Sequence, residues 1–170
     1  MREEVYSGKI IKLYKDKEVN IKGVKFKPEI VKANDGVNVL VKNEKNEIYL
    51  AHQHRFGING VTYELPGGAI DEGEDAKTAA IRELEEEIGL KAGKIKFLFK
   101  VYPSPAWDAH SVSVFIAEEI TEVGQKLDED EEIEIVKMDI DKFIKKVIGG
   151  HIKVDSTTLA TIYYMKNMEG

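Results

Sequence analysis

The chain has 170 residues, no cysteine and a formal net charge of −6, and 42% of its residues are hydrophobic and 33% charged. These values predict one folded domain, 1–170, and exclude disulfides, thiolate metal sites and cysteine nucleophiles. The acidic charge argues against general nucleic-acid binding, and without a membrane-length apolar run or a signal-peptide pattern we expect a cytoplasmic protein with no membrane partner.

The first 34 residues or so are predicted to form an antiparallel β extension. Apolar clusters within 10–13, 19–21 and 24–31 are separated by turn signals at 16–17 and 22–23. A meander this short has little of its own to pack on. We therefore expect it either to cover the main domain or to reach a second subunit.

The next segments predict the central strands. Apolar stretches at 37–41 and 48–52 are expected to pair through the polar loop 43–46. A loop containing Arg55 follows, and then a short strand at 63–65 that ends at Pro66-Gly67-Gly68. Proline before two glycines favours a tight turn in which the backbone can approach a ligand closely.

An acidic helix is predicted between Asp75, as its N-cap, and Gly89, as the residue that ends it. One stripe at i+4 steps is apolar (Ala76, Ala80, Leu84 and Ile88). The adjacent stripe carries Glu83, Glu86 and Glu87, which the helical period brings together.

This clustering of acids needs a compensating cation. Like charges at i, i+4 destabilise a helix by a few tenths of a kcal/mol per pair, and Arg82 can reach Glu86 but cannot neutralise every acid. A divalent metal is the natural compensation, because Mg²⁺ takes one or two carboxylates together with substrate phosphates. A solvated acidic face is the alternative interpretation.

The last third of the chain predicts three more strands, at 95–102, 111–117 and 133–138, and two helices. A proline-containing loop at 103–110 and a strongly acidic, exposed loop before residue 133 connect the strands. Apolar residues at helical spacing predict a helix that ends before Gly149, and Asp155 is expected to cap the final helix.

The acidic helix belongs to a longer pattern. Gly68 is followed after five residues by Glu74, and after seven more by Arg82-Glu83-Leu84-x-Glu86-Glu87-x-Gly89-Leu90. This pattern resembles the Nudix box, with every defining position at its spacing. The resemblance implies an α+β fold, the α/β/α Nudix sandwich with a mixed β-sheet, to which this chain adds its N-terminal antiparallel extension.

The resemblance also implies a metal site for Mg²⁺, with Mn²⁺ as a substitute. The implied ligands are the carboxylates of Glu83, Glu86 and Glu87, the carbonyl of Gly67 and, from the acidic loop, Glu131. Glu86, Glu87 and Arg82 are implied catalytic residues, Arg82 by bracing the glutamates, and Glu74 would support them. Glu129 is an alternative base, and a solvated charged loop is the alternative explanation for both Glu129 and Glu131.

Further features resemble the ADP-ribose pyrophosphatases within that family. These are Gln53-x-Arg55, the approach to the box at 63–68, and Ser104-Pro105. They imply that Arg55, Glu64, Ser104 and Pro105 bind the substrate, and the fork of an arginine suits phosphate. Trp107 could stack on the substrate or only anchor its loop, and His110 is expected to have no special role.

The implied reaction is Mg²⁺-dependent hydrolysis of the pyrophosphate bond of ADP-ribose to AMP and ribose 5-phosphate. Two alternatives stay open. The same chemistry could act on another nucleoside diphosphate derivative, such as GDP-mannose or NADH, or the chain could be a module that binds a nucleotide without hydrolysing it. The subfamily resemblance also implies a homodimer formed through the N-terminal strands.

Overall fold

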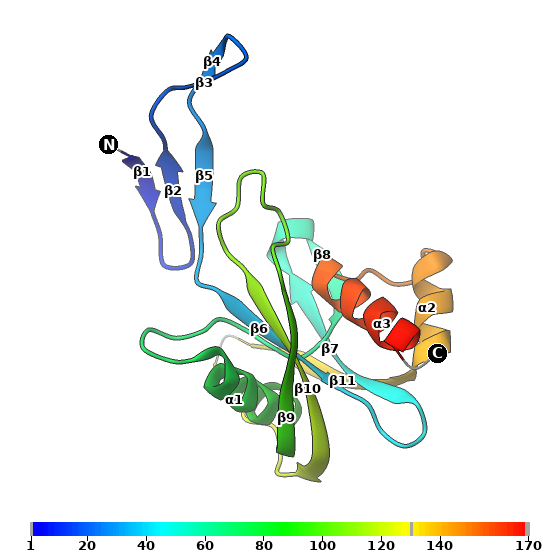
Figure 1. Cartoon of the computed structure of the whole chain (residues 1–170). Coiled ribbons are helices and arrows are strands. Elements are labelled where there is room, and N and C mark those ends of the chain that lie inside the picture. Colours follow the sequence, from blue (N-terminus) through cyan, green and yellow to red (C-terminus); the bar gives the residue numbers. More distant parts are fainter. Residues whose placement is uncertain (1, 130, 169–170) are drawn as a thin grey trace.

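The N-terminal part of the chain forms a small β extension, as predicted. The structure is a computed structural model that describes residues 2–129 and 131–168. Its first strands are β1 (Glu3–Ser7), β2 (Lys12–Lys15), β3 (Val19–Ile21), β4 (Val24–Phe26) and β5 (Glu29–Lys32). Strand β2 pairs antiparallel with β1 and β5, and β3 pairs with β4. Figure 1 shows this extension projecting away from the rest of the molecule.

Two three-stranded sheets form the main body, in the orders β6-β10-β9 and β11-β7-β8. Their strands are β6 (Gly36–Val41), β7 (Glu47–Arg55), β8 (Gly60–Glu64), β9 (Leu90–Val101), β10 (Val112–Glu122) and β11 (Ile133–Asp139), and a short 3₁₀ helix, η1, covers Phe56–Ile58. Strand β10 runs parallel to β6 and antiparallel to β9. The mixed β-sheet that the resemblance implies is therefore confirmed.

The predicted pairing of segments 37–41 and 48–52 is wrong. They become β6 and β7, which lie in different sheets and share only a single bridge between Lys42 and Ile48. The physical reason is that both edges of β6 are occupied. One edge pairs with β10, and on the other Val37 donates its N–H to the carbonyl of Gly68 (2.9 Å) and Val39 donates to that of Pro66 (2.8 Å).

Helices cover both sides of these strands, which gives the sandwich. They are α1 (Ala76–Ile88), α2 (Ile140–Ile148) and α3 (Ser156–Met168), and Figure 1 shows α1 on one side and α2 and α3 on the other. Successive side chains of β6 point to opposite faces: Val39 packs with α1, and Leu40 packs with α2 and α3. No helix among the described residues is long and apolar enough to cross a membrane.

The local signals for α1 are confirmed. The Asp75 carboxylate accepts hydrogen bonds from the N–H groups of Lys77 and Thr78, and Gly89 ends the helix in the left-handed conformation with φ 63°. Leu84 and Ile88 of the predicted apolar stripe are buried. These caps fix where the helix begins and ends, and so fix which carboxylates face the strand-to-helix turn beside it.

Candidate active site

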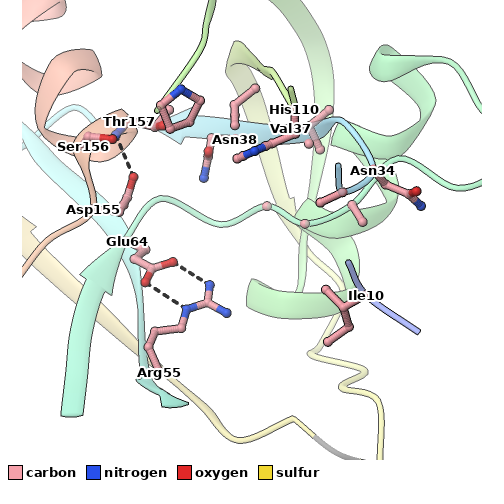
Figure 2. A pocket seen from close by; sticks show the side chains of 17 residues that line it. Ile10, Asn34, Val37, Asn38, Arg55, Glu64, His110, Asp155, Ser156 and Thr157 are labelled. Carbon is pink, nitrogen blue, oxygen red and sulfur yellow. Dashed lines mark hydrogen bonds and ion pairs between the residues drawn. The ribbon is translucent and has the colours of Figure 1, made fainter. Parts of the chain in front are cut away.

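A cavity of about 530 Å³ opens where the two sheets meet the loop 103–110 and the start of α3. It is lined by Arg55, Glu64, Gly67 and Gly68, and on another side by His110. Figure 2 shows that the lining residues come from elements far apart in the sequence, among them Arg55, His110 and Asp155. The turn predicted to approach a ligand therefore does form part of a cavity wall.

Two glycines allow this turn to lie between β6 and the box helix. A Cβ atom on Gly67 would stand 2.0 Å from the carbonyl oxygen of Val37, and one on Gly68 would stand 2.4 Å from Oε1 of Glu83. Gly67 also has a φ of 155°, in the range that favours glycine. Its N–H donates to Oε2 of Glu87 at 2.7 Å. The turn thus joins the cavity to the carboxylates of α1.

Arg82 binds three glutamates at once. Its guanidinium donates to both carboxylate oxygens of Glu74 (3.1 and 3.0 Å), to Glu83 (2.8 Å) and to Glu86 (3.1 Å). The bond to Arg82 lowers the pKa of Glu74, and these acids raise the pKa of Arg82 above its ordinary value. The contacts are those expected of a residue that braces the glutamates.

The carboxyl groups of Glu83 and Glu87 lie in poorly solvated positions. The two residues are only 8% and 3% exposed. Burial raises the pKa of both carboxyl groups. The pKa of Glu87 rises to about 8, because the charges of Glu83 and Glu131 add to the effect of burial. The N–H of Gly67 and the more distant charge of Arg55 only partly offset this effect.

A divalent cation would stabilise such buried, mutually repelling carboxylates, and hard oxygen donors suit Mg²⁺. The residues therefore fit the implied metal in chemistry. Among residues 2–129 and 131–168, however, no three His, Asp or Glu side chains already converge into a metal-binding group. Arg82 engages Glu83 and Glu86, and the Gly67 N–H engages Glu87, which leaves their other oxygens as the candidate donors.

We expect metal-free protein to lose stability as pH rises from about 5 to 8. The folded state keeps a proton on Glu87 up to a pKa of about 8, whereas the unfolded chain releases it near the ordinary value of 4.5, so folding becomes harder across this window. The loss is at most about 5 kcal/mol. Urea unfolding with a chelator at several pH values measures it, and Glu87→Gln should remove most of the fall. An unchanged pH slope in that variant would contradict this assignment.

Arg55 is held at the cavity by a buried partner. Its Nε and Nη2 donate to the two carboxylate oxygens of Glu64 at 2.9 and 2.5 Å, and Thr62 donates its hydroxyl to the same carboxylate. Glu64 raises the pKa of Arg55. Both residues line the cavity as expected of substrate-binding groups, but Glu64 has its oxygens engaged, so its geometry favours orienting Arg55.

The two candidates in the acidic loop have different surroundings. The charge of Glu131 contributes to the raised pKa of Glu83 and Glu87, which places Glu131 within electrostatic reach of the box. Glu129 makes no hydrogen bond or ion pair with any residue that the structure describes. The role of Glu131 as a metal ligand and that of Glu129 as base therefore both stay predictions.

The structure places Ser104, Pro105 and Trp107 outside the cavity lining, which instead includes Pro103 and His110 from the same loop. The carbonyl of Ser104 accepts the N–H groups of Trp107 and Asp108 in a turn, and the Trp107 side chain is 53% exposed. Their substrate contacts stay predictions.

The start of α3 was not predicted to line the cavity, although Asp155, Ser156 and Thr157 do so. Asp155 does cap the helix, as expected, because its Oδ1 accepts the N–H groups of Thr157 and Thr158 at 2.7 and 3.0 Å. The capping signal at Asp155 places the start of the helix but does not indicate that this turn faces the cavity.

Comparison with known proteins gives consistent matches. The model of the NUDIX domain family matches residues 32–156. The chain is 34% identical to the ADP-ribose pyrophosphatase of Bacillus subtilis (strain 168), with 99% of this chain and 91% of that protein covered. It is 28% identical to the methanol dehydrogenase activator of Bacillus methanolicus, over 98% and 91% of the two chains. The crystal structure of an ADP compounds hydrolase matches the fold with a TM-score of 0.79 at 18% identity, covering 99% and 91%.

Proposed function

The chain belongs to the Nudix hydrolase family, and on that basis we propose that it hydrolyses the pyrophosphate bond of ADP-ribose to give AMP and ribose 5-phosphate. The observation that supports this most is the pair of buried carboxylates, Glu83 and Glu87, in contact with a turn that lines a cavity containing Arg55. A relative of nearly equal length that is an ADP-ribose pyrophosphatase supports the substrate.

The proposed cofactor is Mg²⁺, with Mn²⁺ as a substitute, held by Glu83, Glu86, Glu87, Glu131 and the carbonyl of Gly67. When bound, it would neutralise charge on the pyrophosphate and lower the pKa of the attacking water. The location that we propose is the cytoplasm, on composition alone.

The protein's own groups would position the reactants. Arg55 keeps guanidinium N–H groups that Glu64 does not engage, and these would donate to phosphate oxygens. Arg82 fixes the direction of Glu83 and Glu86. The proton from the attacking water would pass to a glutamate, and Glu129 is an alternative to the box glutamates for this role. Most of the rate enhancement would then come from positioning and charge stabilisation.

A panel of nucleoside diphosphate derivatives tests the substrate. We expect ADP-ribose to have the highest kcat/KM when it is compared with GDP-mannose and NADH, with the products separated by chromatography. The expected products are AMP and ribose 5-phosphate in equal amounts. Faster cleavage of GDP-mannose or NADH would keep the family chemistry and overturn the ADP-ribose assignment.

We also propose that the protein is a homodimer formed through the N-terminal extension. The extension projects from the main body (Figure 1), and its apolar side chains are exposed, among them Tyr6 (56%), Ile21 (57%) and Val24 (64%). An exposed apolar surface on a small sheet is typical of an interaction site. A second copy of the chain would bury it.

Sedimentation equilibrium tests this assembly. We expect the wild-type protein to be a dimer, and the double variant Ile21→Lys with Val24→Lys to shift toward monomer, because the two residues pair across the β3–β4 hairpin and charged groups would resist burial. Ile148→Lys is the control, because Ile148 is an exposed apolar residue (73%) in α2, outside the extension. A monomeric wild-type protein would contradict the proposal.

A further inference from the structure

The backbone around His110 is held by the N-terminal extension. Val31, at the end of β5, donates its N–H to the carbonyl of Trp107 at 2.7 Å and accepts the N–H of Ala109 at 3.0 Å. Residues 107–109 therefore run beside β5 as if they were a short parallel strand, with a bridge between Val31 and Asp108. This fixes the chain immediately before His110.

The chain immediately after His110 is held by the segment that leads from β5 into β6. Ser111 donates its N–H to the Asp35 carboxylate at 2.8 Å, and its carbonyl accepts the N–H of Gly36 at 2.8 Å. His110 is thus restrained from both sides by residues 31–36. A loop residue with such restraint keeps its side chain in one place, which a binding group needs.

The imidazole ring is oriented as well. Its Nδ1 lies 2.5 Å from Oδ2 of Asp108, and Oδ1 of the same carboxylate accepts the backbone N–H of His110 at 3.1 Å. The Asp108 side chain is only 9% exposed. Because an ionised carboxylate can only accept, we assign the Nδ1 proton to this bond. The ring then presents Nε2, which bonds no residue that the structure describes.

His110 lines the cavity on a different side from Arg55 and Glu64. Val37 and Asn38 also line the cavity, and Figure 2 shows His110 well away from the Arg55–Glu64 pair. Asn38 donates its side-chain N–H to the carbonyl of Leu65 at 3.0 Å, which leaves its carbonyl oxygen as an acceptor. The cavity wall formed by His110, Val37 and Asn38 combines hydrogen-bonding groups with an apolar one, and it contains no lysine, arginine or box glutamate. Such a surface suits a hydroxylated group better than a phosphate.

We propose that His110, oriented by Asp108, is a specificity residue that hydrogen-bonds through Nε2 to a sugar hydroxyl of the substrate. This rests on the proposed hydrolysis of an ADP-linked sugar and adds the group that recognises the sugar. It also gives the N-terminal extension a second role, because residues 31–36 hold this group against the cavity.

Two substrate analogues test the proposal and identify the sugar. The methyl ester of ADP keeps the pyrophosphate and lacks the distal sugar, and ADP-ribose with a 2′,3′-dideoxyadenosine lacks the hydroxyls on the other side. His110→Ala should reduce the preference for ADP-ribose over one of these analogues by about five- to tenfold, the usual worth of one hydrogen bond. The analogue whose ratio changes shows which sugar is bound.

The amide variants of His110 separate recognition from loop stabilisation. Glutamine places its terminal amide near the position of Nε2, and asparagine places it near Nδ1. If Nε2 binds the sugar, His110→Gln should keep the preference within about twofold and His110→Asn should lose it. If the residue only secures the loop through Asp108, asparagine should be the better replacement. That result would overturn the proposal, as would equal losses with all three substrates.

Calorimetry with Mg²⁺ omitted should also measure the affinity of each protein for ADP-ribose and for the two analogues. The ratios of these affinities give the preference without any cleavage. If the wild-type protein binds these compounds but cleaves none of them, the proposed hydrolysis fails while the role of His110 is still tested. If binding of the wild-type protein does not discriminate ADP-ribose from either analogue, the specificity role is wrong even when hydrolysis occurs.

Discussion

Replacing Glu87 with glutamine should lower the turnover of ADP-ribose by roughly 10³-fold, because several kcal/mol of charge stabilisation at a metal site correspond to a factor of ten per 1.4 kcal/mol. Glutamine has nearly the same shape and can still accept the N–H of Gly67, which Glu87 binds at 2.7 Å. The fold should therefore survive, and the loss should come from the missing charge. Steady-state kinetics at saturating Mg²⁺ measures the effect.

Glu85→Gln is the matched control for this variant. Glu85 lies on the same helix, but it has no hydrogen bond or ion pair through its side chain to any described residue. It should retain the wild-type rate, whereas Glu87→Gln should also need more Mg²⁺ to reach its residual rate. A wild-type rate in Glu87→Gln would show that the buried carboxylates do not form the metal site.

Replacing Arg82 with methionine should lower the free energy of unfolding by about 3–5 kcal/mol, the usual cost of leaving buried charges unpaired. The guanidinium of Arg82 forms ion pairs with Glu74, Glu83 and Glu86. The side chains of Glu74 and Glu83 are nearly buried. Chemical denaturation with a chelator measures the loss. Addition of Mg²⁺ should recover part of it, because a divalent cation would neutralise the same carboxylates.

Lys94→Met provides the comparison for Arg82. Lys94 forms an ion pair with Glu119 in which both side chains are largely exposed, and such pairs contribute about 0–1 kcal/mol. The loss of unfolding free energy in Arg82→Lys should lie between the losses in Arg82→Met and Lys94→Met. Lysine keeps the charge but cannot bind several carboxylates with a planar fork. A loss in Arg82→Met as small as that in Lys94→Met would contradict the bracing role.

The parts of the fold that depend on local signals could be predicted from the sequence. The α1 helix has its cap at Asp75, its end at Gly89 and its apolar stripe within one short stretch, so nothing distant was needed to place them. The pairing of β6 is different. Its partner β10 lies 76 residues later, since Gly36 pairs with Val112, and its other edge is filled by the backbone of the 66–68 turn. Adjacent apolar segments gave no sign of either contact, so a hairpin was predicted instead.

In the candidate site, too, the residues that depend on local signals could be predicted, and those that depend on distant contacts could not. The box glutamates and Arg82 follow from one motif on one helix, and in the structure Arg82 binds Glu83 and Glu86. His110 had no expected role because its restraint comes from Val31 and Asp35, which are far away in the sequence. The residue type of Trp107 allowed either substrate stacking or loop anchoring; its backbone pairs with β5 and its side chain is exposed, so substrate stacking stays a prediction.

The account is tested most directly by incubating the wild-type protein with ADP-ribose in the presence of Mg²⁺ and, in parallel, with a chelator. AMP and ribose 5-phosphate should form in equal amounts with Mg²⁺, and neither should form with the chelator. Intact ADP-ribose recovered from the Mg²⁺ reaction, still bound to the protein, would contradict the account and favour a module that binds a nucleotide without hydrolysing it.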